Sequence, residues 1–390
     1  MVDARDDLLL QRLDRLQKDC LAVAPNNKLR LARRKRRVDV PRNETPGISP
    51  TDIASHNSRA ALEILRRAGP QTRLELSARL LLTEPAIAGI MTRLLDAGHV
   101  GQRKRAGTGR YVSTEYYLLP DSAYAAGISW SGTAGGRACL IDLAGAVVAA
   151  RTFPDIQGAG AAVEALLASE EHRARCRGVA VSLSPQMLAD PVGAMALPQN
   201  LPVRVIEETE AAVLAERIMG VGERDGGIVV ILIGTNVRAG LLIGGKFFKG
   251  EHGRAGNIGA MRTGHDRIPL DDILGPMSRP DFLRSQEPDD PALLDAWAGM
   301  AAGHLKDVVI AIGGFLSPGL ILIGGDMPAW ALDAMIAQVN RQTREFIASF
   351  SVPELVRTHF ASGGCAEGAA ASVFLGDLLP DLALMDAREE

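Results

Sequence analysis

The chain has 390 residues, which is too long for one small hydrophobic core, and at roughly 150 residues per domain it predicts two or three domains. Hydrophobic residues make up 47% and charged residues 23% of the sequence, as in an ordinary soluble protein. The net charge of −3 offers no global attraction to nucleic acid, so any affinity for DNA must come from a local basic patch.

The cysteines and the apolar segments indicate a cytoplasmic, reduced protein. No apolar run approaches the roughly 20 residues that span a bilayer, and the N-terminus lacks a signal-peptide core, so we expect no membrane partner. The cysteines are far apart and form no Cys-x-x-Cys pair, which argues against a disulfide framework and against a cysteine-rich zinc site. They are Cys20, Cys139, Cys176 and Cys365.

Residues 1–57 predict a basic, flexible N-terminal extension. A short amphipathic stretch at residues 6–23 has the spacing of a marginal helix. Residues 28–37 contain seven basic side chains and no acid, and the prolines that follow, up to Pro50, are typical of a linker. The basic run has three interpretations: a solvated disordered tail, an arm that contacts DNA phosphates and enters a minor groove, or a nuclear import signal, against which the rest of the chain speaks.

Residues 58–119 predict a winged helix-turn-helix. A first helix over residues 59–68 ends at a Gly-Pro pair, and a second begins at the capping box formed by Thr72 and Glu75. A third helix begins after Thr83, and its apolar residues recur at i, i+3, i+4, i+7 and i+8 from Ile87. Two strand-like runs, 100–104 and 111–118, then form a hairpin around a glycine-rich tip.

We expect the third helix of this unit to enter the major groove of DNA and the hairpin to act as the wing. The alternative is a small three-helix dimerisation module with a solvated basic loop. The expected DNA contacts are Thr83, Glu84, Pro85, Ala88, Gly89, Thr92 and Arg93 on the helix, and Arg103, Lys104, Arg105 and Arg110 on the wing.

Residues 120–380 alternate strands and helices, which predicts an α/β domain with a cleft between two similar lobes, followed by a tail at 381–390. Strand–turn–strand units near 127–142 and 229–243 indicate an internal duplication. The expected strands are 125–130, 137–142, 147–153, 178–183, 203–206, 227–233, 239–243 and 320–323, and the expected helices are 160–171, 209–220, 291–315, 328–350 and 364–378.

Five short segments in fixed order carry a resemblance to a known family. They are Gly127 to Thr133, Ile206 to Ala212, Gly234 to Gly240, Asn257 to Ala260, and Gly324 to Asp326. Over residues 58–380 the chain resembles the ROK family (repressors, open reading frames and kinases), in particular its repressor branch. The resemblance implies an N-terminal winged helix-turn-helix joined to a two-lobed actin/hexokinase-like (ROK) ATPase-fold domain.

The chain departs from this family at the residues that would carry kinase chemistry. Ser129 replaces the aspartate that orients the metal-bound water, and Arg238 replaces a glycine that makes room for phosphate, although an arginine there can itself bind an anion. Glu208 falls at the position of the catalytic base, beside Glu207 and Glu210. Such crowding predicts a raised pKa for at least one carboxyl, while the alternative is a helix N-terminus that favours acids.

The sugar and zinc motifs are altered as well. The family's Glu-Ile-Gly-His is here Asn257 to Ala260, and the cysteine-rich loop is replaced by residues 265–272, so the resemblance implies no structural zinc. A substitute metal site made by His265, Asp271 and Asp272 is the alternative, although their spacing matches no standard pattern. The expected ligand contacts are Asn200, Glu207, Glu208 and Asn257.

These features together lead us to expect a DNA-binding transcriptional regulator, a repressor of carbohydrate-related genes, that senses a ligand without catalysis. The expected partners are a double-stranded DNA operator, a sugar or sugar-derivative effector, and further copies of the chain in a homodimer or homotetramer. We expect no cofactor and no metal. An active sugar kinase with Glu208 as the base, and a ligand-independent scaffold, are the competing hypotheses.

Overall fold

The computed structural model describes residues 50–105, 113–130, 135–184, 191–222, 224–284, 290–344 and 352–380. The expected helix at 6–23, the basic run at 28–37, Arg110 and the tail at 381–390 lie outside these ranges. Contacts divide the chain into two units, Met1–Ile48 and Ser49–Glu390, and everything below concerns the second unit.

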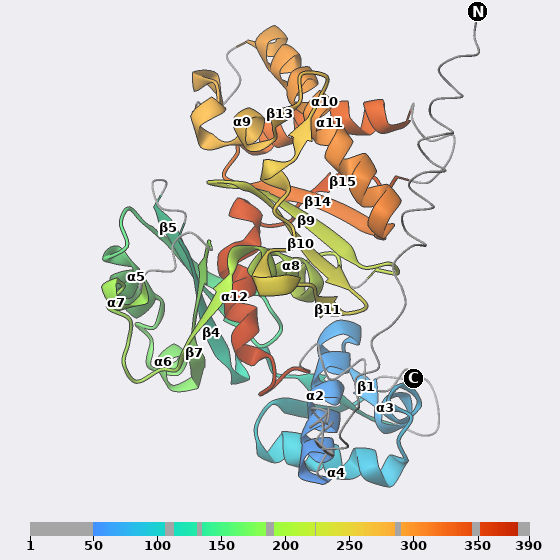
Figure 1. The fold of residues 1–390 in the computed structure, drawn as a ribbon. Helices are drawn as coiled ribbons and strands as arrows, with labels where there is room; N and C mark the ends of the chain where they lie inside the picture. The colour runs from blue at the N-terminus through green and yellow to red at the C-terminus, as the bar shows by residue number, and fades with distance from the viewer. Residues whose placement is uncertain are drawn as a thin grey trace, which may run out of the picture. The chain divides into compact units, whose positions relative to one another are not determined.

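The N-terminal part of this unit is a winged helix-turn-helix (Figure 1). Helices α2 (Pro50–Ala68), α3 (Arg73–Leu80) and α4 (Glu84–Asp96) accompany an antiparallel sheet of β1 (Gln71–Thr72), β3 (Thr114–Leu118) and β2 (Val100–Lys104). Helix α2 begins at Pro50, well before the expected start at residue 59, so the extension expected over residues 1–57 ends earlier than predicted. Proline is tolerated in a first helical turn because the N–H it lacks has no partner there.

Local sequence signals fix the helices of this part. The predicted capping box is confirmed: Glu75 N donates to Thr72 Oγ1 over 3.3 Å, and Thr72 N donates to Glu75 Oε2 over 2.7 Å. The apolar stripe of α4 is buried at Ile87, Ile90, Met91 and Leu94, as its spacing predicted. These side chains pack with those of α2 and α3 into a separate small core.

The first lobe contains a five-stranded sheet in the order β6-β5-β4-β7-β8. Its strands are β4 (Tyr124–Trp130), β5 (Gly136–Asp142), β6 (Val147–Phe153), β7 (Cys176–Leu183) and β8 (Val203–Glu207). The single helix expected at 160–171 is in fact two, α5 (Gly158–Leu166) and α6 (Glu170–Arg175), because Ser169 caps α6 by accepting from His172 N. A short helix α7 (Pro191–Ala194) was not predicted.

The second lobe repeats this topology in a sheet ordered β11-β10-β9-β14-β15. In both sheets the first strand pairs antiparallel with the next and parallel with a later one, which is the duplication that the two strand–turn–strand units predicted. The strands are β9 (Ile228–Ile233), β10 (Val237–Ile243), β11 (Lys246–Phe247), β14 (Leu320–Gly325) and β15 (Leu355–Arg357).

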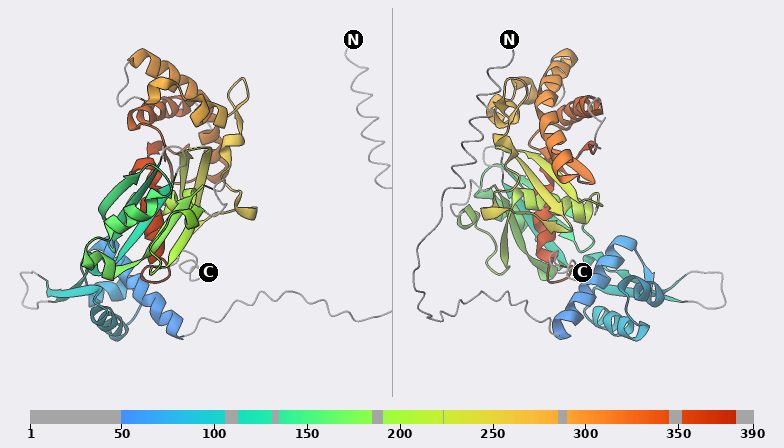
Figure 2. Two further views of the ribbon diagram at one scale, coloured as in Figure 1. Left: turned by 90° about the vertical axis from the view of Figure 1, so that its left-hand side faces the viewer. Right: turned by 45° about the vertical axis from the view of Figure 1, so that its right-hand side comes forward.

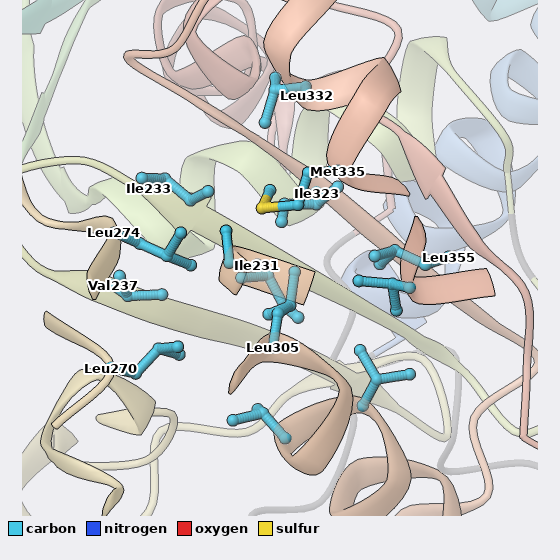
Figure 3. Close-up of a cluster of buried hydrophobic side chains, with 14 of the residues drawn as sticks. Ile231, Ile233, Val237, Leu270, Leu274, Leu305, Ile323, Leu332, Met335 and Leu355 are labelled. Carbon is cyan, nitrogen blue, oxygen red and sulfur yellow. The ribbon is translucent and has the colours of Figure 1, made fainter. Parts of the chain in front are cut away.

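Helices α10 (Pro291–Leu316) and α11 (Ala329–Arg344) pack on this second sheet, together with α9 (Asp271–Leu274) and the hairpin β12 (Arg262–Thr263) and β13 (Ile268–Pro269). Figure 3 shows the core between them, with Ile231, Leu305 and Ile323 at its centre. Short 3₁₀ turns complete the structure: Pro120–Ser122, Glu251–Gly253, Ile258–Ala260, Pro276–Ser278, Asp281–Arg284 and Ala361–Gly364.

Among the described residues, α10 is the one helix long and apolar enough to cross a membrane by length and composition. No such segment was expected from the sequence. Its Trp297, Leu305 and Val309 lie in the core of the second lobe, 0–5% exposed. These side chains therefore belong to the hydrophobic core of that lobe.

Two central helices, α8 (Glu208–Met219) and α12 (Cys365–Phe374), pack against each other, and Figure 2 shows α12 between the two sheets. Their approach is very close, since a Cβ atom on Gly368 would lie 1.7 Å from the carbonyl oxygen of Ala211. Gly127 of β4 similarly lies against the Ala366 carbonyl, where a Cβ atom would be 1.9 Å away. Both positions therefore require glycine.

Candidate functional site

A cavity of about 290 Å³ opens where the strands of both sheets end. Strands β4, β7, β9 and β14 each deliver residues to it from their carboxyl ends or from the turns that follow. Helices α8 and α12 point their N-termini at it through Glu208 and Cys365. Its lining is Ser129, Trp130, Gly135, Gly136, Arg137, Thr152, Phe153, Ser182, Glu208, Leu232, Gly234, Gly325, Asp326 and Cys365.

Glu208 is the central acid of the cavity. The pKa of its carboxyl is raised to about 7, chiefly by burial; the Arg238 guanidinium opposes this rise, and the Glu207 and Asp326 carboxylates contribute to it. The rise predicted from crowding is present, but burial is its largest cause. In the described part of the chain, the Glu208 carboxyl has no hydrogen bond or ion pair. A group of this kind can accept or release a proton near neutral pH.

Arg238 forms a nearly buried ion pair with Glu207. Its Nη2 lies 2.6 Å from Glu207 Oε1, and the arginine side chain is only 7% exposed. Thr209 Oγ1 donates to the same carboxylate oxygen over 3.1 Å. The charge of Arg238 is therefore already matched, and Glu207 serves as its partner instead of facing a ligand.

Asp271 holds the turn between β9 and β10. Its Oδ1 accepts from Val237 N over 2.6 Å, and its Oδ2 accepts from Asn236 Nδ2 over 3.0 Å. Among the described residues no group of three His, Cys, Asp or Glu side chains is placed to hold a metal ion. Asp271 therefore has a structural role in this turn, and the alternative metal site at His265, Asp271 and Asp272 stays an expectation from the sequence.

Two further arginines surround the cavity. Arg137 pairs with the buried Glu367 of α12, with Nη2 to Oε1 at 3.0 Å. Arg279 donates to the backbone carbonyls of Asp326 and Gly234, and burial lowers the pKa of its guanidinium while Asp326 opposes that change. Each guanidinium group around the cavity therefore has an acidic counterpart nearby.

Of the four ligand contacts expected from the sequence, only Glu208 lines the cavity. Asn200 is exposed in the turn before β8, and Asn257 is exposed before the 3₁₀ turn at 258–260. Sequence reasoning missed Trp130, Phe153, Ser182 and Cys365. Aromatic residues are only 4% of the chain, so a tryptophan directly after Ser129 was the available signal.

The expected recognition face of α4 is open to solvent. Thr83, Glu84, Pro85, Gly89, Thr92 and Arg93 are exposed, and Ala88 is partly exposed. Thr92 Oγ1 donates to the Ala88 carbonyl over 3.0 Å, while a Cβ atom on Gly89 would meet nothing nearer than the tip of Arg93 at 3.9 Å. The exposed face of α4 therefore has little side-chain bulk around Gly89, and the Arg93 guanidinium lies at its edge.

The wing arginines are paired with acids of the same domain. Arg103 Nε lies 2.7 Å from Glu115 Oε1, and its guanidinium covers the Tyr117 ring at 5.2 Å from the centroid. Arg105 Nη1 lies 2.6 Å from Glu75 Oε1, and this bond lowers the pKa of Glu75 to about 2. Lys104 is exposed, and Arg110 lies outside the described residues.

Comparison with known proteins finds a family model that matches part of this domain and solved structures with a similar fold. Residues 189–272 match the model of the ROK family. The crystal structure of a ROK family transcriptional regulator, described as a homologue of the E. coli MLC protein, superposes with a TM-score of 0.62 at 17% identity. That match covers 85% of this chain and 98% of the other.

A putative sugar kinase from Cytophaga hutchinsonii superposes with a TM-score of 0.50 at 15% identity, over 65% of this chain and all of the kinase (100%). The ROK hexokinase from Thermus thermophilus gives a TM-score of 0.47 at 18% identity, over 64% of this chain and 97% of that one. Comparison with curated proteins gives no match. The fold is therefore that of a ROK kinase-like domain preceded by a helix-turn-helix.

Proposed function

Because the chain contains a ROK family domain, we propose that it is a DNA-binding transcriptional regulator, a repressor of carbohydrate-related genes, whose kinase-like domain senses a small ligand without catalysis. The observation that carries this proposal is the combination of an exposed α4 face with an altered kinase site in one compact unit. Residues 58–119 are the reader and residues 120–380 the sensor of a cytoplasmic protein that acts as a homodimer or homotetramer.

The altered site supports the absence of catalysis. Phosphoryl transfer needs a base, a metal anchor and open phosphate loops together. Ser129 stands on the cavity wall where the resemblance places the metal-orienting aspartate, and Arg238 fills the second loop position with a side chain locked to Glu207. Glu208 could supply the base, but the metal anchor and the open phosphate loop are then still lacking at Ser129 and Arg238.

Helices α8 and α12 connect the cavity with the reader. Both begin at the cavity, and their far ends carry backbone carbonyls that accept from arginines of α2. Arg66 Nη1 lies 2.6 Å from Ile218 O in the last turn of α8, and Arg59 Nη1 lies 2.7 Å from Gly376 O just beyond α12. A ligand that moves either helix changes what α2 binds, which gives the sensor a physical connection to the DNA-reading unit.

The test is DNA affinity, measured by fluorescence anisotropy at physiological salt. We expect promoter DNA from beside the protein's own gene to bind far more tightly than random DNA, with an affinity that falls steeply as salt rises. Arg93→Ala should weaken operator binding about tenfold or more. Arg173→Ala is the matched control, since it removes the same charge from an exposed ion pair on α6. Equal affinity for promoter and random DNA would refute the regulator.

An active sugar kinase is the second candidate, because the Glu208 pKa of about 7 suits a general base. This candidate requires ATP consumption with at least one hexose and its loss in Glu208→Gln. A ligand-independent scaffold, in contrast, requires that no sugar, sugar phosphate or nucleotide raises the melting temperature. The regulator with a working sensor predicts a thermal shift without ATP consumption.

A further inference from the structure

The charges around the cavity leave one acid without a counterpart. Glu207 pairs with Arg238 and Glu367 pairs with Arg137, while the Asp326 carboxylate acts on the Arg279 guanidinium through its charge. Glu208 remains without a partner of its own among the described residues. The charges that act on it are Arg238, which is already paired with Glu207, and the carboxylates of Glu207 and Asp326. In the described part of the chain the cavity therefore has one negative charge in excess when Glu208 is ionised.

A buried hydroxyl on the cavity wall has no oxygen or nitrogen partner in the described part of the chain. Ser182 is 1% exposed, and its Oγ forms no hydrogen bond within the described residues. It does lie close enough to the Cys365 thiol of α12 to lower the pKa of that thiol, so a weak contact with sulfur is all that the described residues offer it. Buried polar groups are almost always paired, so an orphan hydroxyl that lines a cavity indicates a missing ligand atom.

An aromatic wall forms another side of the cavity. The rings of Trp130 and Phe153 are stacked in parallel, with centroids 5.9 Å apart and planes inclined by 5°. Flat aromatic faces attract cations and cover the apolar faces of small rings.

We propose that the cavity binds a small molecule with a single protonated amine, which pairs with Glu208 while the molecule's body lies against Trp130 and its polar groups reach Ser182. This inference deepens the sensing role proposed above and rests on it for the claim that the cavity binds a ligand at all. The cavity volume of about 290 Å³ suits a molecule of monosaccharide size, such as an amino sugar.

The same charges exclude other classes. A phosphate-bearing ligand would bring negative charge to a site that already has an acid in excess, where Arg238 and Arg137 are each paired with a carboxylate and Arg279 binds backbone carbonyls. A metal ion would need several ligands, and no group of three suitable side chains exists among the described residues. A neutral sugar brings no charge to match the ionised Glu208 carboxylate and can contact it only through hydrogen bonds, so we expect it to bind more weakly than an amine.

The experiment is isothermal titration calorimetry of the full chain with matched pairs of probes: glucosamine and glucose, galactosamine and galactose, mannosamine and mannose, with N-acetylglucosamine as an uncharged relative. We expect the amine of at least one pair to bind about tenfold or more tightly than its neutral partner. If no amine binds, or if the neutral member of every pair binds as tightly, the proposal is wrong.

Proton release provides a readout that a merely structural role would not give. Near pH 7 about half of the Glu208 carboxyls are protonated, and a bound ammonium group lowers that pKa, so binding should release up to about half a proton. Titrations in buffers with different heats of ionisation measure this number. Glu208→Gln should abolish both the amine preference and the proton release.

Glu210→Gln is the matched control on the same helix, because Glu210 pairs with Lys249 over 2.9 Å and does not line the cavity. It should leave the amine preference unchanged. The outcomes separate the two proposals: specific DNA binding without amine binding refutes the ligand class alone, and amine binding without operator preference refutes the regulator alone.

Discussion

Arg66 offers the sharpest test of how the reader is attached to the sensor. Its side chain is 5% exposed, and its Nη1 donates to the Ile218 carbonyl over 2.6 Å while its other nitrogens bind Glu63. Hydrogen bonds from charged groups contribute about 1.5–3 kcal/mol each. In Arg66→Ala the Glu63 carboxylate keeps Arg67 at 2.6 Å, so the loss should be close to that of the one bond to Ile218, about 2 kcal/mol.

The tryptophans make this loss visible. Trp130, Trp297 and Trp330 are the three tryptophans of the chain and all lie in the sensor, whereas the helices of the reader contribute only to far-UV circular dichroism. In urea, the native chain should show coincident transitions by fluorescence and circular dichroism. Arg66→Ala should separate them, with part of the circular dichroism signal lost at lower urea.

Arg79→Ala is the control for this experiment, since Arg79 is exposed in the last turn of α3 and its removal takes the same charge from the reader. It should leave the transitions coincident. If Arg66→Ala also melts in one transition with an unchanged midpoint, the bond to Ile218 does not attach the reader, and the connection through α8 fails with it.

Three further predictions concern the sensor. The pKa of Glu208 is raised from 4.5 to about 7 in the folded state, so the free energy of unfolding should fall as pH rises from about 4.5 to about 7, by at most about 3 kcal/mol, and urea denaturation of Glu208→Gln should lack this decline. Gly368→Ala should lower the melting temperature strongly because its Cβ would overlap Ala211 O, whereas Gly299→Ala on α10, where a Cβ meets nothing within 4 Å, should leave it unchanged or raise it. Asp271→Ala removes the acceptor of Val237 N and should speed amide exchange in the β9–β10 turn; unchanged exchange would contradict the role given to Asp271.

The sequence predicted the elements whose signals are local. The capping box at Thr72, the apolar stripe of α4 and the duplicated strand–turn–strand units depend on residues a few positions apart, and all three are present. The start of α2 was wrong because proline was interpreted as a linker residue when it stands in a first helical turn.

The cavity was harder to predict because it depends on residues distant in the sequence. Glu207 was expected to contact a ligand because of its carboxylate. In the structure that carboxylate binds Arg238, which lies 31 positions away on another strand. Ser182 and Cys365 have no local feature that indicates a site, and they meet only because β7 ends and α12 begins at the cavity. Family resemblance located Glu208, while the charge balance around it required the structure.

The position of Cys365 makes the reactivity of its thiol a measure of how often the cavity opens. This thiol lines the cavity at 8% exposure, and burial together with the nearby carboxyls raises its pKa, so it is inert toward electrophiles while it stays buried. Cys139 and Cys176 are also buried, each on a strand of the first sheet. A small alkylating reagent should therefore modify Cys365 only when the cavity opens, and mass spectrometry of the Cys365 peptide measures the rate of this modification. A bound ligand should lower that rate.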